Sequence, residues 1–250
     1  MRGAEFGHGF RLLDLATVGS TNDVARSLAD AGEPPGLFVR AERQTAGRGR
    51  HGRSWQSPPG NLYASLLLRP ARPPAEIASL SLVAALALAE AIERVSNGRI
   101  APRLKWPNDL QIKDAKLAGI LLEMSADGRG GCAWLIVGIG VNVGWSPLSD
   151  LPYPATCLTA LGSSATPRRL LAALAATLRP RLDLWEREGF AGLREDWLAR
   201  AAGRGSPAAL RIGDRAVRGK LVDIDTAGAL RLEQADGTVA TFSAGEIVLG

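Results

Sequence analysis

The chain has 250 residues, of which 46% are apolar, so it can bury one full core and a small second domain. Its net charge of +5 and pI of about 9.7 favour anionic partners such as nucleotides, an acidic protein surface or nucleic acid. Two cysteines without a CxxC spacing and two histidines argue against a disulfide scaffold, a structural zinc site and a histidine-rich metal centre, and they indicate a reducing cytosol.

The N-terminal part predicts strands that alternate with helices. Its first ten residues contain no apolar run of the kind that signal peptides carry. Ser20, followed three residues later by Asp23, matches a capping box, which predicts a helix from there to about Ala31. Apolar runs predict three strands in this part, over residues 11–16, 37–42 and 62–68.

An uncharged stretch lies between Glu76 and Glu90. It is shorter than the ~20 apolar residues that span a bilayer, so no membrane association is expected. Its alanines and its helical spacing predict a buried helix instead, which ends near the C-cap pair Asn97-Gly98.

The middle of the chain reads as β-structure and then as helix. Four strands are expected there, over residues 103–106, 110–112, 116–124 and 134–143. A loop rich in proline and serine follows over 146–154. Thr166-Pro167 predicts the start of a helix that runs toward Glu188, and Pro180 is expected to kink or split it. A further helix is expected over 190–201.

The last 45 or so residues switch to short strands separated by glycine turns. Five strands are expected, over residues 209–212, 216–224, 229–233, 239–242 and 247–249. This density predicts a small SH3-like barrel. We therefore expect an α+β chain with a larger domain over 1–203 and the barrel over 204–250.

Gly47-Arg48-Gly49-Arg50-His51-Gly52-Arg53, followed by Ser54-Trp55, forms the most distinctive segment. Its glycines allow the backbone to approach a ligand closely. Its arginines carry forked donors that suit phosphate or carboxylate oxygens, and the tryptophan can cover what is bound. The segment predicts a loop that closes on a nucleotide or an acyl-phosphate.

The loop also allows two other interpretations. The glycines satisfy G-x-G-x-x-G, but a dinucleotide site needs a helix directly afterwards. Pro58, Pro59 and Gly60 forbid one, so a Rossmann site is not expected. An exposed basic loop that contacts nucleic acid remains as the alternative.

Six motifs in order along the chain resemble the biotin–protein ligase family. They are Ser20-Thr21-Asn22, Gln44, the segment 47–53 with Trp55, Lys105-Trp106-Pro107-Asn108-Asp109, Lys116-Leu117-Ala118-Gly119-Ile120 and Gly138-Ile139-Gly140-Val141-Asn142. The resemblance runs from Ser20 through the C-terminal strands. It implies a mixed-sheet catalytic domain, related to class II aminoacyl-tRNA synthetases and lipoate ligases, followed by the SH3-like barrel. Only 19 residues precede Ser20, too few for the DNA-binding winged helix of some members, so no DNA binding is expected.

The resemblance also implies a reaction in two steps. Biotin and ATP give biotinyl-5'-AMP, and biotin is then transferred to a lysine of the biotin carboxyl carrier domain of a carboxylase. Magnesium is expected as counter-charge to the phosphates, without a cage of protein ligands. The expected location is the cytoplasm. Homodimers occur among such ligases, and the sequence leaves the oligomeric state open.

Roles for individual residues follow from the same resemblance. The residues expected to bind biotin are Ser20, Thr21, Asn22, Gln44, Arg48, Gly49, Arg50 and Lys116. Those expected to bind ATP or the adenylate are Arg53, Trp55, Asn108, Asp109 and Asn142. The residues expected to take part in catalysis are Lys116, Arg50 and Asp109, and no protein metal ligand is expected.

The residue types fit these roles independently. The hydroxyl and amide groups at 20–22 and of Gln44 can donate and accept hydrogen bonds, as a ureido ring requires, although Ser20 is equally suited to capping a helix. Lys116 opens a strand after a tight turn, where a fixed cation can hold a carboxylate against the α-phosphate. Asp109 is expected to orient the acceptor lysine, and no general base is evident. His51 stands where the family usually has arginine, which weakens phosphate contact.

Two rival functions remain open. A lipoate or octanoate transferase shares the architecture and a lysine by resemblance, but its pocket must accept a plain aliphatic chain, whereas the polar group at 20–22 favours biotin. A nucleic-acid-binding module would use the arginine loop and the barrel. It predicts a steep salt dependence of nucleic-acid affinity.

We expect the loop over 47–53 to be mobile when empty and ordered by biotin or its adenylate. Ordering seven residues costs roughly 7–14 kcal/mol, and two or three charge-assisted hydrogen bonds return only ~1.5–3 kcal/mol each. Hydrogen exchange of these amides should therefore slow when biotin is added. An exchange rate that is already slow without ligand, and unchanged by biotin, would contradict this expectation.

Overall fold

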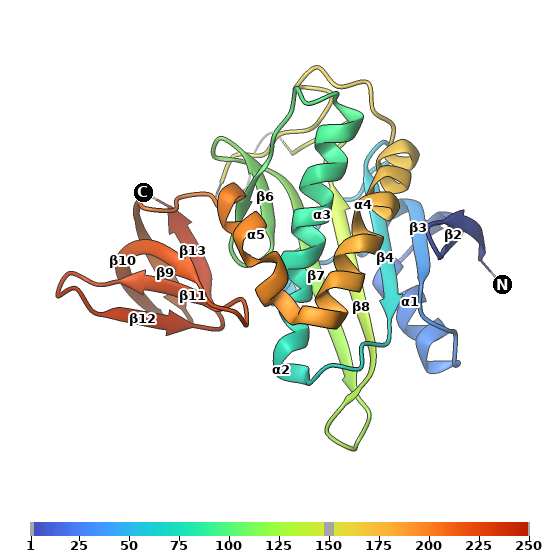
Figure 1. The fold of residues 1–250 in the computed structure, drawn as a ribbon. Coiled ribbons are helices and arrows are strands. Elements are labelled where there is room, and N and C mark those ends of the chain that lie inside the picture. Colours follow the sequence, from blue (N-terminus) through green and yellow to red (C-terminus); the bar gives the residue numbers. More distant parts are fainter. Residues whose placement is uncertain (1–2, 148–152, 250) are drawn as a thin grey trace.

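The computed structural model describes residues 3–147 and 153–249 and contains two β-sheets (Figure 1). The larger sheet has eight strands in the order β1-β2-β3-β4-β8-β7-β6-β5, and the smaller has five in the order β12-β11-β10-β9-β13. In the larger sheet β2 and β3 are parallel and the other neighbours are antiparallel. The chain is thus α+β with a mixed sheet, as expected.

The elements follow one another closely along the chain. The strands of the larger sheet are β1 (Ala4–Gly7), β2 (Phe10–Val18), β3 (Leu37–Gln44), β4 (Leu62–Leu68), β5 (Arg103–Lys105), β6 (Asp109–Ile112), β7 (Ala115–Ala126) and β8 (Cys132–Val141). The helices are α1 (Thr21–Asp30), α2 (Pro74–Ile77), α3 (Leu80–Val95), α4 (Pro167–Glu188) and α5 (Arg194–Arg200), with the 3-10 turns η1 (Arg50–Gly52) and η2 (Gly189–Leu193). The smaller sheet contains β9 (Pro207–Ile212), β10 (Arg215–Ile224), β11 (Leu230–Glu233), β12 (Val239–Phe242) and β13 (Glu246–Leu249).

The larger sheet is covered on both faces. Successive residues of a strand point to opposite faces, and the apolar residues divide accordingly. Leu12 and Phe38 belong to the core that contains α3 and α4, whereas Leu13 and Val39 pack in a second cluster with Ala25 of α1. Figure 1 shows α3 and α4 side by side across one face. Helix α1 therefore packs on the opposite face.

Helix α3 accounts for the long uncharged stretch. It is buried almost all around between the sheet and α4, so it needs apolar or small residues on every face. Pro74–Val95 is the one segment in the described part of the chain that is long and apolar enough to cross a membrane, and here most of it is buried inside the protein. The predicted C-cap is confirmed, because Asn97 and Gly98 have φ of 52° and 75°.

Pro180 was expected to kink or split its helix, and it does not split it. Helix α4 runs from Pro167 to Glu188 with Pro180 inside it. Pro180 is exposed, while Leu178 and Leu182 are buried. The carbonyl that loses its hydrogen bond therefore lies toward water, and packing on the buried side holds the helix together.

Most elements match the predicted ranges to within a few residues. The edge strand β1 and the single turn α2 were not predicted, because four residues are too short for a periodic pattern. The loop expected over 146–154 lies partly outside the described residues.

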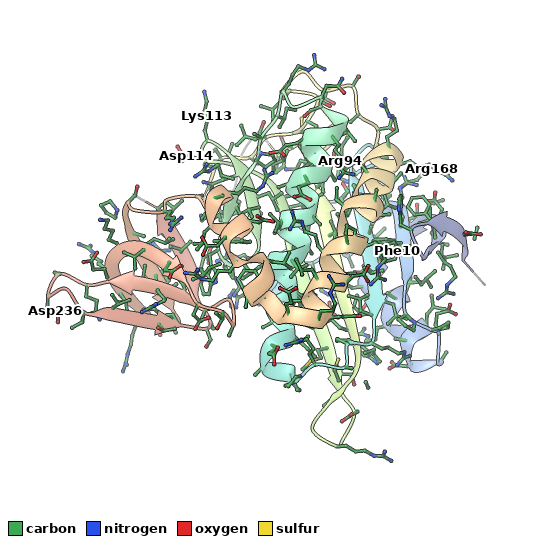
Figure 2. All side chains as sticks on the ribbon, viewed as in Figure 1. Phe10, Arg94, Lys113, Asp114, Arg168 and Asp236 are labelled. Atoms are coloured by element: carbon green, nitrogen blue, oxygen red, sulfur yellow. The ribbon has the colours of Figure 1, made fainter. Side chains whose placement is uncertain are left out.

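The smaller sheet is fixed firmly to the rest of the molecule. Leu210, Leu221 and Leu232 belong to the same continuous core as α3. The indole Nε1 of Trp106 donates to the carbonyl of Gly228 at 3.0 Å, and Arg194 is paired with Asp223. At the other end of this sheet, the turn that carries Asp236 projects farthest from the larger sheet (Figure 2).

Replacing Gly228 with alanine should loosen this attachment. Gly228 has φ of +88°, and an added Cβ would lie 2.7 Å from Leu82 Cδ1. Gly237 has φ of +82° but open space around it, so Gly237→Ala is the matched control. We expect the control to lose about 1–2 kcal/mol from left-handed strain and Gly228→Ala to lose ~1–3 kcal/mol more from overpacking. Urea unfolding measures both, and equal losses would contradict the prediction.

Candidate active site

A cavity lies on the α1 face of the larger sheet. On β8, Ile136 packs under α1, and the next two residues on the same face are Gly138 and Gly140. A Cβ at Gly138 would lie 2.5 Å from Asn22 Oδ1, and one at Gly140 would lie 2.7 Å from the ring of Trp55. Because Gly138 and Gly140 carry no side chain, space remains above β8, and Asn22 and Trp55 border that space.

The structure brings nearly all the predicted site residues together around this cavity. Those that line it are Ser20, Thr21, Asn22, Gln44, Arg48, Gly49, Arg50, Arg53, Trp55, Asn108, Asp109 and Lys116. They come from strands β3 and β7, from the starts of β6 and α1, and from the glycine-arginine loop. Asn142 does not line the cavity. It is buried, and its Nδ2 donates to the carbonyl of Thr156 at 3.1 Å, so it supports a neighbouring loop.

One end of the cavity is a cluster of neutral polar groups. The backbone N–H and the hydroxyl of Thr21 both donate to Gln44 Oε1, at 2.8 and 3.0 Å. The hydroxyl of Ser65, on β4, lies 2.7 Å from Thr21 Oγ1 and 2.6 Å from Asn22 Oδ1. Thr21, Asn22 and Ser65 are buried and Gln44 is half-buried. The four side chains hold one another in place, so the cluster is rigid before any ligand arrives.

The capping-box interpretation of Ser20 is wrong. Ser20 occupies the N-cap position with extended backbone, but its side chain makes no capping hydrogen bond. The N–H of Thr21 is satisfied by Gln44 instead. Ser20 lines the cavity.

At the other end of the cavity stands a lysine beside a carboxylate. Lys116 Nζ lies 2.6 Å from Asp109 Oδ1, and both side chains are mostly buried. The same ammonium lies 5.5 Å from the ring centre of Trp55 and 5.3 Å from that of Tyr153, within the range of cation–π attraction. The cation is thus fixed between two aromatic walls and a partner that an anionic ligand can displace.

The glycine-arginine loop folds over the cavity as a small hairpin. Arg48 and Ser54 form an isolated antiparallel bridge, and the N–H of Gly49 donates to the carbonyl of Arg53 at 2.7 Å. Between them lies only the single turn η1. The next element after η1 is the strand β4, so the described part of the chain has no helix at the place where a dinucleotide fingerprint requires one. We call residues 47–55 the lid.

Two of the lid arginines are paired with carboxylates of the same chain. Arg48 donates through both terminal nitrogens to Asp23, each at 2.8 Å, and Arg53 donates likewise to Glu246 at 3.0 and 2.7 Å. The hydrogen bonds from Arg53 lower the pKa of Glu246. An anionic ligand that binds here must compete with these internal partners.

Arg50 is the most enclosed of the three. Its nitrogens lie 3.2 Å from Asn108 Oδ1 and 3.3 Å from the carbonyl of Gly245. Burial lowers its pKa, because removal from water disfavours the charged form. Among the described residues no carboxylate is hydrogen-bonded to this poorly solvated guanidinium, so it is well placed to receive a carboxylate or phosphate of a ligand.

Sequence reasoning missed several residues that line the cavity. They are Lys105, Gln111, Asp114, Leu121, Tyr153 and Glu246, in addition to the framework glycines. Gln111 is the second residue of the strand predicted over 110–112. Because alternate residues of a strand share a face, its position two residues after Asp109 could have placed it on the same face as Asp109. Glu246 carries no motif, and nothing local places it beside a loop nearly 200 residues away.

Comparison with known proteins decides the family. Residues 16–142 match the model of the biotin/lipoate A/B protein ligase family, and residues 205–250 match that of the biotin protein ligase C-terminal domain. A biotin–[acetyl-CoA-carboxylase] ligase of Paracoccus denitrificans is 40% identical over 94% of this chain and 99% of its own length. The chain belongs to the biotin protein ligase family.

Solved structures of this family have the same fold. A biotin protein ligase from Aquifex aeolicus in complex with biotin and ATP matches 96% of this ligase and 98% of its own chain, with a TM-score of 0.80 and 30% identity. One from Leishmania major in complex with biotinyl-5-AMP matches 93% and 98%, with a TM-score of 0.66 and 30% identity. The architecture with its C-terminal five-stranded sheet is therefore that of the family.

Replacing Gly140 with alanine should displace Trp55 and loosen the lid of the ligase. The added methyl would meet the indole ring at 2.7–2.9 Å, and the ring must move because the other atoms are strand backbone. We expect amide exchange in residues 47–55 to become about tenfold faster, which is ~1.4 kcal/mol of opening free energy. Gly19→Ala, with open space around it, is the control. Unchanged exchange in Gly140→Ala would show that the lid does not depend on this contact.

Proposed function

We propose that this chain is an ATP-dependent biotin–[acetyl-CoA-carboxylase] ligase that forms biotinyl-5'-AMP and transfers biotin to a lysine of a biotin carboxyl carrier domain. One observation supports this most directly. A single cavity has a neutral polar cluster at one end and the Lys116 ammonium at the other, beneath a lid that carries three arginines. Biotin has matching ends, a neutral ureido ring and a carboxylate.

The two ends of the cavity orient biotin for reaction. Thr21, Asn22 and Gln44 offer amide and hydroxyl groups to the ureido ring. The carboxylate then points toward Lys116, which exchanges part of its contact with Asp109 for the ligand. Trp55 and Tyr153 flank the ammonium and exclude water from its surroundings. This exclusion strengthens the attraction between the ammonium and an anion.

In the first step a biotin carboxylate oxygen attacks the α-phosphorus of ATP, and the bond to the β-phosphate oxygen breaks, which releases pyrophosphate. Two anions must approach each other, so cations supply the catalysis. Lys116 neutralises the carboxylate and α-phosphate, and Arg50 and Arg53 reach the same region from the lid. Asn108 holds Arg50 in place through its Oδ1.

In the second step the acceptor amine attacks the acyl carbon, the bond to the phosphate oxygen breaks, AMP leaves, and the amine proton passes to solvent. Asp109 is placed to orient the incoming lysine, because its carboxylate already holds one ammonium at 2.6 Å. Until then the lid keeps water from the mixed anhydride.

Magnesium would arrive with the ATP phosphates and supply counter-charge to them. The carboxylate of Asp109 is a hard oxygen donor on this side of the cavity. Residues 3–147 and 153–249 contain no group of three or more His, Cys, Asp or Glu side chains that could hold a metal ion by themselves. Both cysteines are free thiols, which suits the cytoplasmic location we propose.

The rival functions are less well supported. A lipoyl or octanoyl chain would leave the polar groups of Thr21, Asn22 and Gln44 without partners, at a cost of ~1–3 kcal/mol for each buried group. A nucleic-acid surface needs arginines that are free to meet phosphates, whereas Arg48 and Arg53 are paired with Asp23 and Glu246.

Biotin-dependent exchange between ATP and pyrophosphate tests the proposal. Lys116→Ala should lower the exchange rate about 100- to 1000-fold, the usual loss for one electrostatic donor, without unfolding the protein. Lys113→Ala removes an exposed lysine on the turn between β6 and β7 (Figure 2) and is the control. Exchange supported by lipoate instead of biotin, or near-normal exchange in Lys116→Ala, would overturn the assignment.

A further inference from the structure

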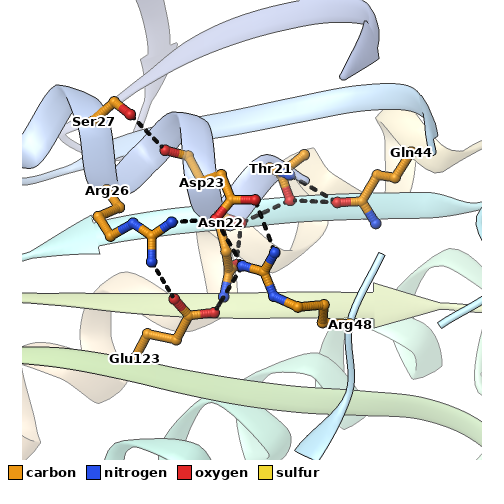
Figure 3. Close-up of polar contacts among 9 residues, drawn as sticks. Thr21, Asn22, Asp23, Arg26, Ser27, Gln44, Arg48 and Glu123 are labelled. Carbon is orange, nitrogen blue, oxygen red and sulfur yellow. Dashed lines mark hydrogen bonds and ion pairs between the residues drawn. The ribbon is translucent and has the colours of Figure 1, made fainter. Parts of the chain in front are cut away.

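A cluster of alternating charges lies just outside the cavity, between the lid and the sheet (Figure 3). Its members are Asp23 and Arg26 in the first turns of α1, Arg48 of the lid and Glu123 of β7. Only Arg48 lines the cavity among these four. We call this cluster the clasp.

Asp23 is the centre of the clasp. It receives both terminal nitrogens of Arg48 at 2.8 Å, the forked geometry that makes such pairs strong and directional. Arg26 Nη2 approaches the same carboxylate at 2.6 Å. The pKa of Asp23 is lowered, chiefly by its hydrogen bonds from Arg48, so the carboxylate is ionised throughout the physiological range.

Glu123 links the clasp to the floor of the cavity. Its Oε1 accepts from Asn22 Nδ2 at 2.8 Å and lies 3.5 Å from Arg48 Nη2. Asn22 in turn belongs to the rigid polar cluster through Ser65. One carboxylate thus touches both the lid and a residue proposed to bind the ureido ring.

The lid is tied down on two sides. Arg53 holds its far strand to Glu246 of the smaller sheet, and the clasp holds its near strand to α1. Between these ties the hairpin is short and its tip is exposed. Loss of Asp23 would leave the side chain of Arg48, as far as the described residues go, with the longer contact to Glu123.

We infer that Asp23 is a positioning residue that holds the lid closed through Arg48 and so sets how long the activated intermediate stays bound. The inference rests on the proposed function, since the retained ligand is the acyl-adenylate. Asp23 does not line the cavity, so it acts on the lid and not on the reacting atoms. It should therefore govern release much more than the chemical step.

Asp23→Asn in the full chain tests this, because it keeps the shape of the side chain and removes its charge. Biotinyl-AMP is formed in the enzyme and its release is followed after a chase with excess unlabelled biotin and ATP. We expect release to be about three- to tenfold faster than in the wild type. Adenylate formation at saturating biotin and ATP should change less than about twofold, and Asp23→Glu should restore part of the retention.

The salt dependence of release distinguishes loss of the ion pairs in the clasp from a general weakening of α1. The Debye length falls to ~3 Å at 1 M salt, so wild-type release should speed up between about 0.05 M and about 1 M KCl and approach the rate of Asp23→Asn. The variant keeps the Arg53–Glu246 tie, which salt also screens, so its release should speed up with salt by a smaller factor than that of the wild type. A variant that is faster than the wild type by the same factor at both salt concentrations would mean that only the helix start was weakened, and it would overturn the inference.

A matched control removes a similar pair elsewhere. Asp183 receives Arg179 at 2.5 Å on α4, away from the cavity, so Asp183→Asn should release the adenylate at the wild-type rate. Equal release from Asp23→Asn and the wild type would refute the role of Asp23 while leaving the proposed function intact. A wild-type protein that makes no adenylate from biotin and ATP would refute the proposed function itself.

Discussion

A buried site on the face of a β-sheet requires that some strand give up its side chains there. In this ligase β8 does so at Gly138 and Gly140, directly beyond the area that α1 covers. The amide of Asn22 and the indole of Trp55 occupy positions that a Cβ on either glycine would invade. The polar cluster, the fixed ammonium and the lid are all arranged around these two glycines. The shape of the site therefore follows from the missing side chains on β8.

Charge around the cavity is balanced within the chain itself. Arg48, Arg53 and Lys116 each have a carboxylate partner, and for the mostly buried Lys116 this pairing avoids the large cost of burying an unpaired cation. It also means that an anionic substrate gains affinity only by the difference between two sets of ion pairs. Arg50 has no carboxylate hydrogen-bonded to it in the described structure, and it is the residue on which a ligand's charge would have the greatest net effect.

Local patterns in the sequence were sufficient for much of this fold. The period of the apolar residues located the buried helix α3, and turn residues located the hairpins of both sheets. The resemblance to the ligase family also assigned Lys116, Trp55 and the residues at 20–22 to one site. Local sequence patterns did not predict features that depend on contacts between residues far apart in the sequence. Packing on its buried side carries α4 through Pro180. Gln44, from a different strand, accepts the first N–H of α1 while Ser20 makes no capping hydrogen bond. Glu246 reaches the site only through the docking of the smaller sheet.

The ties between the lid and the smaller sheet join parts of the chain that are very far apart in sequence. Arg53 and Glu246 are separated by 193 residues, and Arg50 and Gly245 by 195. Closing so large a loop is entropically costly until most other structure has formed. The central strands and α3 can therefore assemble first, while the enclosure of the cavity belongs to the last stage of folding. A partly folded molecule would have the floor of the site but no means of keeping a reactive compound inside it.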